Sequence, residues 1–130
     1  MQIATRHCAD AIVATLAGRI DHQSAASFEA ALVPLLAQAA ASQGALVLDF
    51  SGVDYISSVG LRVLMIAARQ LREGQAQLLV SALQTVVAEI FAISRFDRIL
   101  TVTATVDDAL ALCSPAALAQ YRGAGAAPAA

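Results

Sequence analysis

The sequence has few of the residues that build metal and redox sites. Cys8 and Cys113 are its two cysteines, and they lie far apart with no CxxC spacing, which argues against a zinc site or a redox motif. His7 and His22 are its two histidines, too few for a histidine-rich metal cluster. We therefore expect free thiols, no bound metal and no cofactor.

Long apolar runs and clustered positive charge are also lacking. No stretch of about 18 uninterrupted apolar residues could span a bilayer, and Arg6, His7 and Asp10 interrupt the region where a secretory signal needs an apolar segment. The net charge is -2, with both signs scattered along the chain, so the basic stripe that nucleic acid binding requires is missing. We expect a cytoplasmic protein that neither inserts into a membrane nor binds nucleic acid.

The N-terminal third predicts a hairpin followed by a helix. Apolar and polar residues alternate over 2–8 and 11–17, the pattern of two paired strands. Polar groups at 21–24 can cap a helix at 24–41, whose apolar stripe recurs at helical spacing. Pro34 lies inside that helix and predicts a kink or an early break, because proline lacks the amide hydrogen and clashes with the preceding turn.

The rest of the chain alternates between apolar strands and amphipathic helices. Residues 45–50 read ALVLDF, typical of a strand covered on both faces, and Ser51-Gly52 resembles a turn. The further elements expected are a short segment at 53–56, a helix from Ser57 or Ser58 to Gly74, a strand at 76–82, a helix at 84–92, a strand at 98–103 and a helix at 106–119.

This order predicts an α/β fold with right-handed crossovers. The expected sheet is mixed, with four to five strands, and about four helices cover it. We expect one domain over residues 1–122 and a flexible Gly/Ala/Pro tail over residues 123–130, where too little apolar surface is available to offset the cost of ordering.

Two adjacent hydroxyls mark the segment most informative about function. Ser57 and Ser58 stand where the chain enters a helix, and a helix N-terminus offers unpaired amide hydrogens and a positive partial charge. A phosphate on either serine would be stabilised there. The alternative is that both serines only cap the helix.

At this point the chain resembles a known family. GRIDHQSA at 18–25, LVLDFSGVDYISSVGLRVL at 46–64 and the apolar pattern to about residue 118 are similar to the STAS domain of bacterial anti-sigma factor antagonists. The family motif reads Asp-Ser-Ser/Thr-Gly-Leu, and its first serine is phosphorylated by a partner kinase. Alignment on Gly60 places Ser58 at the phosphoacceptor and Val59 at the second hydroxyl residue. Ser57 stands where the family has aspartate.

The resemblance implies a surface that binds the partner, and a STAS-like fold. Asp21 matches a family aspartate near the acceptor, and its local alternative role is to cap a helix. Arg62 follows Ser58 by one helical turn and could contact a partner carboxylate or a phosphate. The alternative is a solvated surface arginine. The full expected set of partner-binding residues is Asp21, Ser57, Ser58, Val59, Gly60 and Arg62.

The function implied is a non-enzymatic switch. The unphosphorylated protein would bind an anti-sigma factor that is also a serine-protein kinase, phosphorylation of Ser58 would end binding, and a serine phosphatase would restore it. One alternative is a STAS-type accessory subunit of a membrane transporter. Another is a serine-dependent enzyme, which the lack of a G-x-S-x-G motif or a histidine-based nucleophile motif disfavours.

Overall fold

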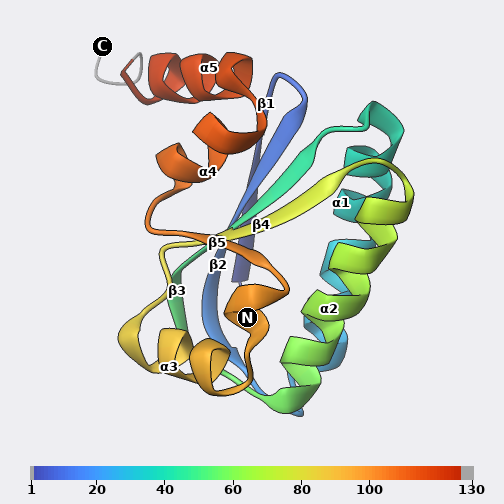
Figure 1. The fold of residues 1–130 in the computed structure, drawn as a ribbon, viewed down its shortest axis with the longest axis vertical. Coiled ribbons are helices and arrows are strands. Elements are labelled where there is room, and N and C mark those ends of the chain that lie inside the picture. The colour runs from blue at the N-terminus through green and yellow to red at the C-terminus, as the bar shows by residue number, and fades with distance from the viewer. Residues whose placement is uncertain (1, 127–130) are drawn as a thin grey trace.

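The strands form one mixed sheet in the order in which they occur along the chain (Figure 1). The structure is a computed structural model that describes residues 2–126. The first two strands are antiparallel, and each later strand runs parallel to its neighbour. The five strands are β1 (Gln2–Cys8), β2 (Ala11–Ile20), β3 (Ala45–Ile56), β4 (Gln77–Ser81) and β5 (Thr101–Thr103).

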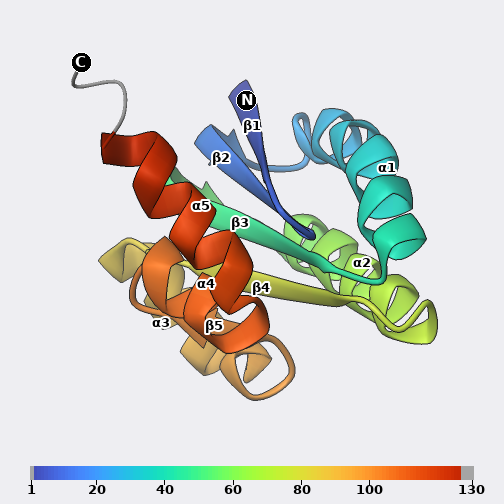
Figure 2. The same ribbon diagram turned by 90° about the horizontal axis from the view of Figure 1, so that it is seen from above.

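Helices cover both faces of this sheet. In Figure 2, α1 and α2 lie together on one side, and α4 and α5 lie on the other. The helices are α1 (Ala25–Ser42), α2 (Ser58–Glu73), α3 (Thr85–Ile93), α4 (Val106–Cys113) and α5 (Pro115–Ala126), with a short 3-10 helix at Phe96–Arg98. The α/β fold, the hairpin, the mixed sheet and the start of α2 are therefore confirmed, and residues 2–126 contain one more α-helix than expected.

The alternation along β3 divides the core between the two faces. Leu46, Leu48 and Phe50 are buried against α1, α2 and α3, whereas Ala45 and Val47 are buried against α4 and α5. All five side chains are at most 2% exposed. This explains the continuous apolar run in the sequence, because a strand covered on both faces needs apolar residues at every position.

Helix α1 is long and apolar enough, by length and composition alone, to cross a membrane. Its large apolar side chains Phe28, Leu32 and Leu36, however, are buried in the protein core beside α2 and the sheet. A core helix near the N-terminus passes the same test. The packing of α1 is that of a core helix.

Strand β3 is twice as long as expected, and the prediction of a turn at Ser51-Gly52 was wrong. The strand continues through these residues, and its pairing with β2 has register shifts between Thr15 and Ala17 and between Gly18 and Arg19. A Cβ at position 52 would lie 2.7 Å from the carbonyl oxygen of Leu16. Glycine at this position marks a close approach of two strands rather than a chain reversal.

Three further expectations need correction. Helix α1 runs through Pro34 without a break, with Pro34 on its exposed side. The last strand begins at Thr101 rather than residue 98, because the 3-10 helix occupies residues 96–98. The tail was expected from residue 123, but α5 continues to Ala126, and residues 127–130 lie outside the described residues.

The single helix expected at 106–119 is two helices, because the chain turns at Ser114. The backbone of Ser114 is extended, and its buried hydroxyl accepts a hydrogen bond from the amide of Ala117 (3.1 Å) and donates one to the carboxylate of Asp10 (2.6 Å). Pro115 is the first residue of α5, a position that needs no amide hydrogen. The Ser-Pro pair was thus a helix-start signal that the sequence interpretation missed.

Candidate functional site

The register of two parallel strands brings the candidate residues together. Ile20, the last residue of β2, pairs with Ile56, the last residue of β3. The amide of Ser57 donates a hydrogen bond to the carbonyl of Ile20 (2.7 Å). Asp21 and Ser57 therefore leave the same edge of the sheet side by side, at the carboxyl ends of the parallel strands where ligand and partner sites of α/β sheets concentrate.

Ser57 is the N-cap of α2 and is only 3% exposed. Its hydroxyl oxygen accepts a hydrogen bond from the amide of Gly60 (3.2 Å), and its carbonyl accepts one from the amide of Leu61 (2.9 Å). These bonds satisfy donors that would otherwise be unpaired at the helix start. The role of Ser57 in the fold is to begin the helix.

Ser58 has the opposite character. It is the first residue of α2, its side chain is exposed, and its hydroxyl has no hydrogen-bond partner among residues 2–126. Val59 and Arg62 are exposed beside it on the first turns of the helix. Two adjacent serines with the same chemistry are thus separated by burial, and Ser58 is the one that a second protein can reach.

Gly60 allows the helix start to lie directly on the ends of β2 and β3. A Cβ at this position would lie 2.7 Å from Cγ2 of Ile20 and 2.8 Å from Cγ1 of Ile56. Both isoleucines are at most 1% exposed, so neither has free space into which it could move. The requirement for glycine here is one of close packing, and it determines where Ser58 stands.

The carboxylate of Asp21 organises the turn into α1. Its Oδ1 accepts hydrogen bonds from the amides of Gln23 and Ser24 (both 3.0 Å) and from the hydroxyl of Ser24 (3.1 Å), and its Oδ2 lies 3.3 Å from Nε of Arg19. The backbone hydrogen bond from Ser24 is the main cause that holds the pKa of Asp21 below its ordinary value. Asp21 is therefore a capping carboxylate that keeps its charge near the acceptor.

Arg19 and Tyr55 are neighbours that the sequence interpretation did not single out. They are paired across β2 and β3, and the guanidinium carbon of Arg19 lies 4.2 Å from the centre of the Tyr55 ring. Arg19 thus contacts both Tyr55 and Asp21. The pairing depends on the shifted register of β2 and β3, so no local sequence signal could have revealed it.

An apolar strip extends the exposed surface of α2 away from Ser58. Ile66 is 48% exposed, and Val33 of α1 is 59% exposed across a shallow groove between the two helices. The inner face of α2 is buried as expected, with Leu61, Leu64 and Leu71 in the core. Apolar side chains that are exposed together on one face are typical of a surface that binds another protein.

The catalytic alternatives find little support in this geometry. His22 is exposed, and the Nε2 of His7 is hydrogen-bonded to the side chain of Gln38 (2.8 Å), so among residues 2–126 neither histidine is hydrogen-bonded to Ser58. Across the same residues no group of three or more His, Cys, Asp or Glu side chains could hold a metal ion. A serine nucleophile needs a base within hydrogen-bond reach, and neither histidine meets this requirement for Ser58.

The chain is similar to known proteins in both sequence and structure. A family model described as Mlab, STAS domain, matches residues 3–102. BtrV of Bordetella bronchiseptica, named as an anti-sigma factor antagonist, is 40% identical over 91 residues, which are 70% of this chain and 76% of BtrV. The crystal structure of an anti-sigma factor antagonist from Mycobacterium paratuberculosis superposes with a TM-score of 0.76 at 25% identity, covering 85% of this chain and 92% of that one.

Structures of lower identity show the same fold. The Bacillus cell fate determinant SpoIIAA in its phosphorylated form superposes with a TM-score of 0.62 at 15% identity, covering 84% of this chain and 96% of that one. The unphosphorylated form of SpoIIAA gives a TM-score of 0.64. With the family match over residues 3–102 and the identity to BtrV, the chain belongs to the STAS domain family of anti-sigma factor antagonists.

Proposed function

We propose that this protein is a partner switch in which Ser58 is the phosphoacceptor. In the unphosphorylated state, the surface around Ser58 binds an anti-sigma factor that is also a serine-protein kinase, in the cytoplasm. Phosphorylation ends that binding, and a serine phosphatase restores it. The observation that carries the proposal is the contrast between Ser57, which is buried in the helix cap, and Ser58, which is exposed at the first position of α2.

The helix start supports a phosphate without cost to the fold. A phosphoserine at the first turn of α2 meets the positive end of the helix dipole and its unpaired amide hydrogens. The phosphate adds about -1.5 to -2 charges and strongly hydrated oxygens to a surface that must lose water when a partner binds. A penalty of about 3 kcal/mol at the interface weakens affinity more than a hundredfold.

The replacement of the family aspartate by Ser57 is compatible with this role. Serine and aspartate are both favoured N-cap residues, and Ser57 does accept the capping hydrogen bond from Gly60. The replacement keeps the helix start and removes one negative charge beside the acceptor. Partner recognition then relies on the remaining polar groups, Asp21 and Arg62, and on the exposed Val59 and Ile66.

The test is a titration against the natural partner. Tagged protein is used to capture the kinase from cells of its own source, the kinase is purified, and its binding to wild type, Ser58→Ala, Ser58→Asp and phosphorylated protein is measured by calorimetry. We expect Ser58→Ala to bind within about threefold of wild type, Ser58→Asp to bind more weakly, and phosphorylated protein to bind at least about a hundredfold more weakly.

Ser57→Ala is the matched control for labelling, since it removes the neighbouring hydroxyl and leaves Ser58 in place. Mass spectrometry of the kinase-treated protein is expected to find phosphate on Ser58 alone. Phosphate on Ser57, or equal affinity for phosphorylated and unmodified protein, contradicts the proposal. Capture of a transporter ATPase or permease without phosphate on Ser58 supports the alternative of a transporter accessory subunit.

A further inference from the structure

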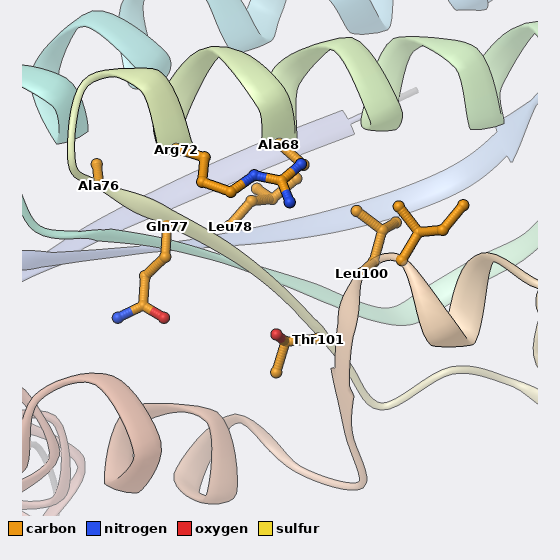
Figure 3. A pocket seen from close by; sticks show the side chains of 8 residues that line it. Ala68, Arg72, Ala76, Gln77, Leu78, Leu100 and Thr101 are labelled. Carbon is orange, nitrogen blue, oxygen red and sulfur yellow. The ribbon is translucent and has the colours of Figure 1, made fainter.

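A cavity lies at the opposite end of α2 from Ser58. It has a volume of about 270 Å³ and opens between the last turns of α2, the start of β4 and the segment before β5 (Figure 3). Ser58 and Arg72 are separated by 14 positions of α2, about 21 Å at the rise of an α-helix. A ligand in this cavity would not contact the proposed phosphoacceptor.

The cavity exists because β5 is shorter than β4. Pairing between them begins at Leu79 and Thr101, so the first two residues of β4, Gln77 and Leu78, have no partner on the β5 side. The chain that would extend β5 backwards instead forms the 3-10 helix and returns through Ile99 and Leu100. A space remains where further residues of an edge strand would otherwise lie.

The polar side chains that line this space are the Arg72 guanidinium, which only donates, and the Thr101 hydroxyl and the Gln77 carboxamide, which both donate and accept. The amide of Gln77 donates to the carbonyl of Gly44 on the β3 side (3.1 Å). Successive amides of a strand point to opposite edges, so the amide of Leu78 points toward the cavity. The side chain of Arg72 reaches along the cavity toward Leu100 in Figure 3, and Thr101 adds a hydroxyl.

Arg72 is an exposed residue, and its guanidinium has no ion-pair partner among residues 2–126. The ion pairs within residues 2–126 are Arg19 with Asp21 and Arg122 with Asp107, so no described carboxylate pairs with the Arg72 guanidinium. Apart from the Gln77 side chain, the remaining walls are apolar and consist of Ala68, Ala76, Leu78, Ile99 and Leu100. A guanidinium fork and a backbone amide beside an apolar wall match a carboxylate joined to an apolar body.

We propose that this cavity binds a small carboxylic acid with an apolar body. Arg72 holds the carboxylate as a charge-assisted hydrogen-bond donor, Leu78 contributes its amide, and the aliphatic part of the ligand covers Ala68, Ile99 and Leu100. The site goes beyond the proposed switch and does not depend on it, since none of its residues belongs to the Ser58 surface.

The experiment is an amide chemical-shift titration of the full chain with sodium octanoate, octan-1-ol and octylamine as probes. Octanoate is expected to bind with a dissociation constant on the order of 1 mM, as suits about ten non-hydrogen atoms. The shifts should concentrate on the amides of Ala76, Leu78 and Thr101. The alcohol and the amine are expected to bind at least about tenfold more weakly, because neither can pair with a guanidinium.

Variants of two arginines on α2 make the test specific. Arg72→Gln is expected to weaken octanoate binding by about tenfold or more, whereas Arg69→Gln, which changes an exposed arginine outside the cavity, leaves it unchanged. The amide spectrum of each variant reports whether it is folded. The proposal is overturned if Arg72→Gln binds like wild type, if octylamine binds as tightly as octanoate, or if no cavity amide shifts at ten times the expected dissociation constant.

Discussion

The starts of α1 and α2 lie side by side but use their polar side chains differently. At the start of α1, the carboxylate of Asp21 is held by two amides, one hydroxyl and Arg19. At the start of α2, the hydroxyl of Ser57 accepts the capping hydrogen bond from Gly60. The next residue, Ser58, is exposed, and its hydroxyl forms no hydrogen bond with residues 2–126. Asp21 and Ser57 therefore hold the edge of the sheet in place, whereas the hydroxyl of Ser58 is exposed to solvent.

The largest effect on stability is expected from a substitution at Gly60, where the start of α2 packs closely on the ends of β2 and β3. Gly60→Ala should destabilise the fold by about 2 kcal/mol, because the added Cβ meets two buried isoleucines and the gain in helix propensity only partly offsets the strain. Chemical denaturation measures the change. The matched control is Gly74→Ala, where the nearest atom to the added Cβ is 3.5 Å away and the free energy of unfolding should change by less than about 0.5 kcal/mol. Equal losses in the two variants would show that packing at position 60 is not special.

Replacing Ser57 should lower the stability of the fold more than replacing Ser58, because Ser57 is buried and Ser58 is exposed. Ser57→Ala is expected to lower the free energy of unfolding by about 1 kcal/mol, because the amide of Gly60 loses its capping acceptor. Ser58→Ala should change it by less than about 0.5 kcal/mol, since no residue in the range 2–126 forms a hydrogen bond with that hydroxyl. Urea unfolding of both variants checks the pair. If Ser58→Ala costs as much as Ser57→Ala, the division of roles proposed for these serines is wrong.

The smallest effect concerns the charge of Asp21. Because its pKa in the folded protein lies below the ordinary value, chiefly through the backbone hydrogen bond from Ser24, its ionised form stabilises the fold above the unfolded pKa of about 3.9. This contribution is lost as the pH falls through the folded pKa. Wild type should therefore lose more stability than Asp21→Asn between about pH 6 and pH 3. This loss is measured by comparing the urea midpoints of the two proteins over that pH range. A difference in midpoint that stays constant with pH would contradict the expectation.

The sequence predicted the candidate site because its signals are local. A continuous apolar run, two hydroxyls and an amphipathic stripe ending at Gly74 specify a strand, a cap and a helix within 30 residues, and the structure has them at these positions. The family motif then distinguished Ser58 from Ser57. Local chemistry left the two equivalent, and in the structure Ser57 is buried whereas Ser58 is exposed.

The errors occurred where distant segments decide the local conformation. Ser51 and Gly52 have the composition of a turn, yet Gly52 stays in β3 because β2 approaches it too closely for a side chain. Ser114 divides the last helical segment, and its hydroxyl contacts Asp10, 104 positions earlier in the chain. Composition alone could not place either contact.

The sequence by itself determined the order of the strands and of the first four α-helices, the α/β class and the start of α2, because periodicity and capping act over a few residues. Only the tertiary structure decided which polar groups meet. The register of Ile20 with Ile56 places Asp21 beside Ser57, and the same ladder places Arg19 over Tyr55. Register is a property of two strands that are separated along the chain, and it is set by how both bury their apolar faces in one core.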